Sequence, residues 1–348
     1  MRMFPWIFGL LLALSVSGAE IQFNFGDYPE GATPTNFQAV LAGGGAPGVW
    51  KILSAETPSA FAAFGTNAPI LNRSRVLAQT SDDPTDERFP MLVYAGEKFR
   101  NFKFTTRFQI VSGVTEQMAG VVFRYQNASN YYVVRVNALA KNIRFYKMVD
   151  GTQSEPIGAD VEIAAGVWHS LGVQCEGTQI TITFDDKPVM PALGDNTFNE
   201  GRLGFRTKSD AVCYFTEALV DYTPIVPAAQ LMVNTLVQAQ PKIMGLRIYT
   251  ADTNNIVRVI ASQDTAEIGT AGTDAEQRAI ADGTVSFGRE KGAVVMTLPL
   301  HDRNGEYIAA VRLRLKSFLG ETQDNALTRA RMILGQIQGQ VMSDKDLL

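Results

Sequence analysis

The chain has two histidines, His169 and His301, the side chains best suited to proton transfer near neutral pH. His169 lies in WHSLGVQC, where polar and apolar residues alternate with the period of a β-strand. His301 stands beside Asp302 at a predicted turn. General acid–base catalysis needs a partner group and a cleft, and nothing near His169 in sequence supplies them. We expect a strand residue at His169 and an exposed turn residue at His301, with a pH-responsive role for His301 as the alternative.

Cys175 and Cys213 are the only cysteines. In an oxidising compartment they could form a disulfide. The alternative is two small buried hydrophobic residues, and the sequence does not show whether the Cα atoms come within bonding distance. Two cysteines and two histidines that are all far apart match no zinc-binding spacing.

Tyrosines and arginines gather around the predicted turn NASN. Sugar rings stack on exposed aromatic side chains, so we expect Arg124, Tyr125 and Tyr132 to contact a carbohydrate ligand. The alternative is that these aromatic side chains fill a β-sandwich core. Tyr131 and Tyr132 point to opposite faces of one strand, so at most one of them is free to bind.

A second candidate site lies near the C-terminal end of the chain. Arg247 and Tyr249 share one face of a predicted strand. Guanidinium groups match carboxylates, so these residues could meet an anionic small ligand between the sheet and the loop that crosses it. The alternative is a solvated face of an antiparallel sheet.

Residues 20–223 are predicted to be all-β. The clearest alternating segments are 103–111, 118–127, 131–139 and 142–151. The stretch 166–189 reads as a hairpin followed by another tight turn. Residues 42–90 are rich in Gly, Pro, Ala and Asp, which predicts long loops with interspersed strands.

Two prolines in DYTPIVPAAQ mark a boundary, after which residues 224–348 follow an α+β pattern. The expected elements are a helix carrying Met232, Leu236, Ala239 and Ile243 on one face, a strand–turn–strand over 245–262, a short helix over 272–283, a hairpin over 293–318 and a helix over 322–341. Thr273 and Glu276 have the spacing of a capping box, and Gly283 stands at the helix end.

The stretches GVVFRYQNASNYYVVRV, WHSLGV, ITITFDDKPV and GRLGFRTKSDAVCYFTEALV follow in the order typical of one fold family. Residues 95–223, and more loosely 20–95, resemble concanavalin A-like (laminin-G-like) jelly rolls, including the glycosidase-like domain of bacterial exported proteins. Asp186 stands where that family usually has Gly. The resemblance implies a β-sandwich jelly roll over 20–223.

The same resemblance covers sugar binders, adhesion modules and glycoside hydrolases, so it does not define one activity. Its hydrolases often carry a Glu-x-Asp-x-Glu strand, which this chain lacks. Acids in 85–89 and 215–221 have other spacings and fit loop and strand-face charges. Laminin-G-like sandwiches can hold calcium, so Asp82, Asp83 and Asp86 form a candidate metal site; a solvated acidic loop is the alternative. No other cofactor is expected.

The later stretches IYTADTNNIVRVIASQDTAEIGTAGT and TLPLHDRNGEYIAAVRLRLKSF resemble extracytoplasmic PAS-like sensor modules called Cache domains. The matching residues are Ser262, Asp264, Ile268, Gly269, Pro299, Leu300, Asp302 and Gly305. This implies an antiparallel sheet with flanking helices over 224–348. Cache domains usually drive a cytoplasmic output module that this sequence lacks, so signalling would require a protein partner.

The N-terminal stretch MRMFPWIFGLLLALSVSGAE is typical of a signal peptide over residues 1–19, with cleavage before Glu20. Its apolar run is shorter than the roughly 20 residues that span a bilayer, and no later segment is long and apolar enough to span one. The net charge of -4 offers no basic field for nucleic acid. We expect a periplasmic or secreted protein.

The sequence thus predicts an exported, non-catalytic protein of two domains that binds carbohydrate through the first and a small metabolite through the second. The first alternative is a glycoside hydrolase that uses the concave face of the β-sandwich. The second alternative is a structural or adhesive surface protein.

Overall fold

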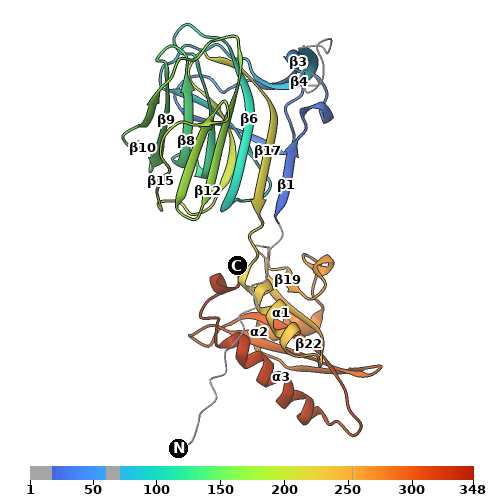
Figure 1. Ribbon diagram of the computed structural model, residues 1–348. Helices are drawn as coiled ribbons and strands as arrows, with labels where there is room; N and C mark the ends of the chain where they lie inside the picture. The colour runs from blue at the N-terminus through green and yellow to red at the C-terminus, as the bar shows by residue number, and fades with distance from the viewer. Residues whose placement is uncertain (1–17, 60–70, 253) are drawn as a thin grey trace, which may run out of the picture. The chain divides into compact units, whose positions relative to one another are not determined.

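The structure is a computed structural model that describes residues 18–59, 71–252 and 254–348 (Figure 1). The chain divides into two units, and the boundary lies between Ile225 and Val226. Residues 1–17 of the predicted signal peptide lie outside the described residues. Within the described ranges, no helix is both long and apolar enough to cross a membrane.

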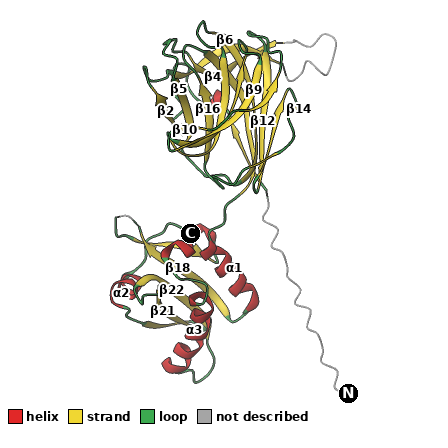
Figure 2. Ribbon diagram, turned by 90° about the vertical axis from the view of Figure 1, so that its left-hand side faces the viewer, coloured by secondary structure: helices red, strands yellow, loops and turns green. Residues whose placement is uncertain are grey.

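Unit 1 is a β-sandwich, as the alternating pattern predicted (Figure 2). Its elements are β1 (Ala19–Phe23), η1 (Phe25–Asp27), β2 (Phe37–Gly43), β3 (Trp50–Pro58), β4 (Leu71–Gln79), β5 (Arg88–Tyr94), β6 (Asn101–Ser112), β7 (Met118–Asn127), β8 (Asn130–Asn137), β9 (Asn142–Val149), β10 (Thr152–Gln153), β11 (Ile157–Asp160), β12 (Trp168–Glu176), β13 (Gln179–Phe184), β14 (Lys187–Pro188), β15 (Leu193–Gly194), β16 (Arg202–Thr207) and β17 (Val212–Thr223).

Two antiparallel sheets form the sandwich. Among the described residues, sheet A has nine strands in the order β14-β13-β12-β6-β17-β4-β3, with β1 beside β17 and β15 beside β13. Sheet B has eight strands in the described ranges, in the order β10-β9-β8-β7-β16-β5-β2, with β11 beside β9. The core lies between the sheets, where alternate side chains such as Phe104, Phe108, Val134 and Phe205 are buried together. Burial of this apolar surface is the main stabilising term of the unit.

The stretch 166–189 forms the predicted hairpin. Strands β12 and β13 pair from Leu171↔Phe184 to Glu176↔Gln179. A two-residue turn at Asp185 and Asp186 then leads into β14, and both residues have positive φ, 46° and 62°. A type I′ turn requires positive φ at both central positions, and aspartate tolerates this better than most side chains.

Residues 42–90 contain more strand than their composition predicted. Strands β3 and β4 pair over nine residues, from Trp50↔Gln79 to Pro58↔Leu71. The Gly- and Pro-rich sequence is confined to the connections, while Ile52 and Leu77 enter the core. Residues 60–70 lie outside the described residues.

Unit 2 is an α+β fold around one antiparallel sheet. Its elements are α1 (Ala228–Ala239), β18 (Ile243–Ala251), β19 (Val257–Ser262), η3 (Thr265–Glu267), α2 (Asp274–Asp282), β20 (Ser286–Glu290), β21 (Ala293–His301), β22 (Tyr307–Lys316), α3 (Gln323–Gln338) and η4 (Asp344–Leu347). In the described part of this unit the sheet has five strands in the order β19-β18-β22-β21-β20. Helices α1 and α3 pack on one face of the sheet, and α2 packs on the other.

The helix boundaries in unit 2 follow local chemistry. The predicted capping box of Thr273 and Glu276 is present at the start of α2, and Gly283 ends that helix with φ 75°. Helix α1 ends at Ala239, so Ile243, which was predicted to share its apolar face, opens β18 instead. Pro241 explains the difference, because proline cannot continue a helix.

Candidate functional site

Arginine side chains form a row on the outer side of sheet B, the side that faces away from the core. Cross-strand partners share a face of a sheet. Arg144 pairs with Arg135, Arg135 with Gly120, and Gly120 with Arg206. Three arginines therefore lie in one row across β9, β8, β7 and β16, with no side chain at the glycine between them.

Tyrosines and aliphatic side chains lie beside this row. In the adjacent row Tyr146 pairs with Val133, and Val133 with Val122. Tyr131 follows on the same face of β8, and its ring stacks on Tyr125 at 6.1 Å between centroids. We call this surface the tyrosine–arginine face, and it comprises Phe89, Tyr125, Tyr131, Arg135, Arg144, Tyr146, Arg202 and Arg206.

Arg206 is the buried centre of the tyrosine–arginine face. Arg206 is 1% exposed. Its Nη1 donates to the Tyr146 hydroxyl at 2.6 Å, and its guanidinium lies 4.2 Å from the centroid of the Phe89 ring. Burial disfavours its charged form, but the neighbouring Tyr146 and Tyr131 hydroxyls outweigh burial and hold the pKa of Arg206 above the ordinary arginine value. Arg206 therefore remains a buried cation.

Few carboxylates balance the positive charge of this face. Within the described residues, Arg135, Arg202 and Arg206 make no ion pair, and Arg144 pairs only with Asp160 at 2.5 Å. Burial lowers the pKa of Arg135, but arginine remains protonated in proteins. The half-buried guanidinium groups and Tyr125 can donate hydrogen bonds to a polar ligand and offer a ring for stacking.

The structure separates the predicted residues of the first site. Tyr125 lies half-buried on the tyrosine–arginine face. Arg124 is fully buried, and its guanidinium donates to the carbonyl oxygens of Phe198 (2.7 Å) and Gly177.

Tyr132 is also fully buried and faces the core. Its hydroxyl donates to Asp195 and accepts from the backbone N–H of Phe198 at 2.9 Å. Burial and the bond to Asp195 raise the pKa of Tyr132 to about 12. Arg124 and Tyr132 thus hold the loop before β16 against the sandwich, while Tyr131, which we did not select, occupies the outer face.

Two of the three predicted metal-binding acids, Asp83 and Asp86, have partners within the protein, and Asp82 is exposed. Asp83 accepts from the backbone N–H of Ala46 (2.7 Å) and Thr85 (2.9 Å), and these bonds lower the pKa of Asp83 to about 2. Asp86 pairs with Lys208 at 2.7 Å. Across residues 18–59, 71–252 and 254–348 there is no group of three or more His, Cys, Asp or Glu that could hold a metal ion.

The predicted Cys175–Cys213 disulfide is absent, since both cysteines are free and buried. Strand β6 lies between their strands, and on β6 Cys175 is opposite Phe102 while Cys213 is opposite Ile110. Eight residues along a strand span about 26 Å, whereas bonded cysteines have Cα atoms about 4.4–6.8 Å apart. Burial raises the pKa of the Cys175 thiol to about 12 and raises that of Cys213 further.

His169 has a carboxylate partner that its local sequence did not reveal. Its Nδ1 lies 2.8 Å from Asp185 Oδ2, and its ring packs on Phe184 at 4.9 Å. The second ring nitrogen, Nε2, lies 3.3 Å from the carbonyl oxygen of Ala164. Both ring nitrogens therefore have hydrogen-bond partners within unit 1, which is typical of a structural residue. His301 is exposed at the predicted turn.

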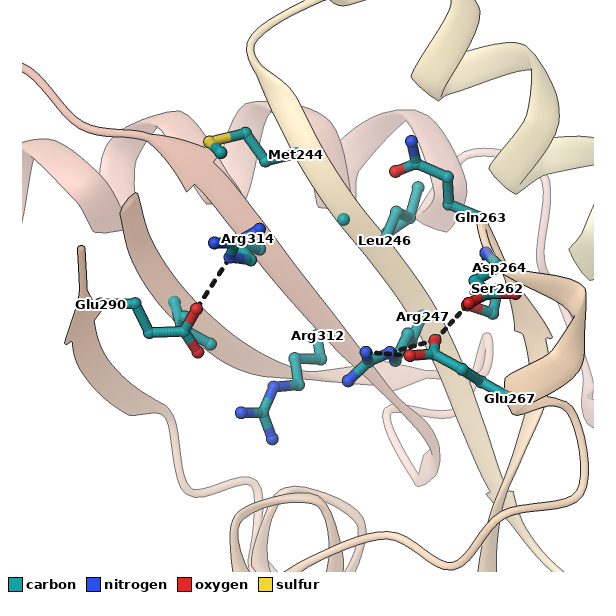
Figure 3. A pocket seen from close by; sticks show the side chains of 12 residues that line it. Met244, Leu246, Arg247, Ser262, Gln263, Asp264, Glu267, Glu290, Arg312 and Arg314 are labelled. Carbon is teal, nitrogen blue, oxygen red and sulfur yellow. Dashed lines mark hydrogen bonds and ion pairs between the residues drawn. The ribbon is translucent and has the colours of Figure 1, made fainter. Parts of the chain in front are cut away.

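Unit 2 contains a cavity of about 570 Å³ on the face of the sheet that carries α2. We call it the Arg312 pocket, and it is lined by Met244, Gly245, Leu246, Arg247, Ser262, Gln263, Asp264, Glu267, Glu290, Val295, Arg312 and Arg314. Figure 3 shows the Arg312 guanidinium between two ion pairs. These are Arg247 with Glu267, and Arg314 with Glu290 at 2.8 Å. The predicted partner Tyr249 is 3% exposed and packs beneath α2, outside the pocket lining.

A buried carboxylate anchors Arg312. Glu276 is fully buried, and its Oε1 accepts from Arg312 Nη1 and Thr297 Oγ1, both at 3.1 Å. Its Oε2 accepts from the backbone N–H of Thr273 at 2.8 Å. Burial alone would raise the pKa of Glu276, but the hydrogen bonds from Thr273 and the charge of Arg312 lower it. The buried Glu276 carboxylate thus holds the Arg312 guanidinium in a fixed position at the pocket.

The match to a known family concerns unit 1. Residues 53–215 match the model of the 3-keto-alpha-glucoside-1,2-lyase-like domain family. No curated protein matches the chain.

Among solved structures, similar chains include carbohydrate-binding module CBM66 from Bacillus subtilis, at 20% identity over 49% of this chain and 94% of that chain, with a TM-score of 0.37. A Bacillus subtilis protein of unknown function with a galectin-like fold is 10% identical over 50% of this chain and 89% of that chain, with a TM-score of 0.34. A native glycosidic hydrolase is 10% identical over 62% of this chain and 100% of that chain, with a TM-score of 0.37. Unit 1 is a β-sandwich, and its central part is similar to a 3-keto-alpha-glucoside-1,2-lyase-like domain.

Proposed function

We propose that the protein binds carbohydrate through the tyrosine–arginine face of unit 1. The observation that carries this proposal is the set of tyrosines and arginines on the outer side of sheet B, where, within the described residues, Arg135, Arg202 and Arg206 make no ion pair. Tyrosine rings offer stacking surfaces and guanidinium groups donate hydrogen bonds to hydroxyl oxygens. The match of residues 53–215 to a family named for a glucoside supports the same ligand class.

A binding test with two matched tyrosine variants addresses this proposal. Tyr125→Ala removes a half-buried ring from the tyrosine–arginine face, whereas Tyr214→Ala removes a half-buried ring from β17 in sheet A. We expect the full chain to bind members of a glycan array, Tyr125→Ala to bind at least ten-fold more weakly, and Tyr214→Ala to bind like the parent. Equal loss in both variants, or no binding by the parent, would contradict the proposal.

A lyase or hydrolase is the second candidate, favoured by the same family match. The rows of the tyrosine–arginine face contain no carboxylate that could serve as one of two paired catalytic acids. We therefore favour binding over bond cleavage. Release of reducing sugar, or of a 3-keto sugar from a 3-keto-glucoside, by the purified chain would decide for the enzyme.

For unit 2 we propose a PAS/Cache-like sensor module that binds a small anion in the Arg312 pocket. Its strands, numbered within the unit, follow the order 2-1-5-4-3 that such modules use, and the segment with α2 crosses the arginine-bearing face. A thermal-shift screen with small mono- and dicarboxylates tests this. We expect at least one to stabilise the parent and Arg278→Gln but not Arg312→Gln, because Arg278 is an exposed cation on the same unit outside the pocket lining.

We also propose export to the periplasm or beyond, based on the signal-like stretch at residues 1–19. The first strand of unit 1, β1, begins at Ala19. N-terminal sequencing of the protein from its native host is expected to begin at Glu20.

A further inference from the structure

Arg206 differs from the other large, fully buried arginines of unit 1. Arg88 donates to the carbonyl oxygens of Ala46 (2.6 Å) and Ser209 (2.6 Å), among other acceptors. Arg124 donates to two carbonyl oxygens. Arg206 donates one hydrogen bond to the Tyr146 hydroxyl, and its Nε has no acceptor, although a guanidinium has five N–H donors. Within the described residues its charge is balanced by the Tyr146 and Tyr131 hydroxyls and the Phe89 ring, and by no carboxylate.

Some buried polar atoms of the tyrosine–arginine face lack a hydrogen-bond partner. Among the described residues, the buried side-chain nitrogens and oxygens that lack a hydrogen-bond partner include Arg206 Nε, Arg202 Nε and the Tyr131 hydroxyl. Most buried polar atoms in proteins are hydrogen-bonded, and an unpaired one costs about 1–3 kcal/mol. These atoms are buried, so Arg202 Nε and Arg206 Nε would act on a ligand through positive charge rather than through direct contact.

Like charges also lie next to one another in the arginine row. Arg135 and Arg144 are direct cross-strand partners, and charges of one sign in this position repel each other. Glu116 lies near Arg135, but its carboxylate already binds Lys208 (2.9 Å) and Asn137 (2.8 Å). Asp160, the partner of Arg144, is 83% exposed and so balances little of the charge.

We propose that the tyrosine–arginine face is selective for acidic oligosaccharides that carry uronic acid carboxylates. This inference rests on the proposed carbohydrate function and names its substrate class. The half-buried Arg135 and Arg144 would contact the carboxylates, since the planar guanidinium fork matches a carboxylate in two hydrogen bonds. Arg206 adds positive charge from below. Arg202 and Arg206 are four residues apart on β16, about 13 Å, so the favourable field extends beyond one sugar ring.

The test measures binding to the full chain by calorimetry for three oligosaccharides of equal length. The first carries uronic acids, the second is its carboxyl-reduced, neutral counterpart, and the third carries sulfate groups in place of carboxylates. We expect the uronic acid ligand to bind at least ten-fold more tightly than the neutral one at low salt, and the preference to shrink as salt rises. Arg135→Gln should reduce the preference at least five-fold, because it weakens binding of the uronic acid ligand more than binding of the neutral one.

The control variant is Arg73→Gln, which removes one exposed positive charge from β4 in sheet A and should leave the preference unchanged. Equal binding of acidic and neutral ligands would overturn the selectivity and leave the carbohydrate function standing. A preference for the sulfated ligand over the uronic acid would overturn the carboxylate assignment. Failure to bind any of these ligands or any member of the glycan array would overturn the function and the inference together.

Discussion

Neighbouring tyrosines in one strand have opposite roles in this protein. Tyr132 faces the core and holds Asp195, whereas Tyr131 faces outward and stacks on Tyr125. Similarly, Arg124 donates to two carbonyl oxygens in the core, whereas Arg206 lies beneath the outer face and donates to the Tyr146 hydroxyl. The face of the sheet, rather than the residue type, therefore separates the core side chains from those of the proposed binding face.

This difference between Arg206 and Arg124 predicts that their replacement changes the free energy of unfolding by different amounts. Arg206→Met removes a buried charge with one hydrogen bond, so the free energy of unfolding should change by less than about 1 kcal/mol, because buried charges can often be replaced by apolar groups of similar volume. Arg124→Met removes a donor from the carbonyl oxygens of Phe198 and Gly177 and should cost about 1–3 kcal/mol. Both can be measured by urea unfolding followed by tryptophan fluorescence, since Trp50 and Trp168 lie in unit 1. A larger loss of unfolding free energy for Arg206→Met than for Arg124→Met would contradict the proposal that Arg206 serves ligand binding rather than stability.

Asp83 predicts a pH dependence of unit 1. Its pKa in the folded chain is about 2, below the ordinary value of about 4. A group with a lowered pKa adds stability above its unfolded pKa and loses that contribution as pH falls through its folded pKa. The stability difference between the parent and Asp83→Asn should therefore be constant above about pH 5 and shrink between about pH 4 and 2. A difference that persists unchanged at pH 2 would refute the role of this carboxylate.

At the level of elements, sequence patterns predicted local structure well and sheet neighbours poorly. Alternation identified the strands of unit 1 after residue 100 but not the full extent of β3 and β4. The two-residue turn at Asp185 and Asp186 follows from local backbone chemistry. Pro241 was visible in the sequence, yet the apolar spacing suggested that the helix continued to Ile243. The outward direction of Tyr131 and Arg206 depends on which face of sheet B meets sheet A, and no local pattern contains that information.

The start of α2 depends on one buried carboxylate, which gives a prediction at the same scale. Glu276→Gln should destabilise α2 by about 2–4 kcal/mol, because it leaves the Arg312 guanidinium without its buried charged partner. Hydrogen exchange of the α2 amides should become faster, while exchange in α3 stays unchanged. The matched control is Glu290→Gln, which breaks the exposed pair with Arg314 and should leave α2 exchange unaffected. Unchanged α2 exchange in Glu276→Gln would contradict this account.

For the whole molecule, the division into a β-sandwich and an α+β unit agrees with the change in sequence pattern near the prolines after residue 220. Long-range topology was harder to anticipate. The sequence left a disulfide between Cys175 and Cys213 open, but β6 lies between their strands. The tyrosine–arginine face also depends on long-range topology, because it combines residues from β5, β7, β8, β9 and β16.

The cysteine arrangement can be checked on the intact chain. Because both thiols are buried and unbonded, a thiol reagent should label neither in the native protein and both in denaturant without reductant. Burial raises both thiol pKa values, which slows labelling further because the thiolate is the reactive form. Labelling that requires reductant would show a disulfide and contradict the topology of sheet A.

The most direct test of the central claim is a crystal structure of the full chain with the oligosaccharide that binds best on a glycan array. The account predicts a sugar ring stacked on Tyr125, with Arg135 and Arg144 bonded to the ligand. A sugar seated on the outer side of sheet A, or only in unit 2, would contradict it.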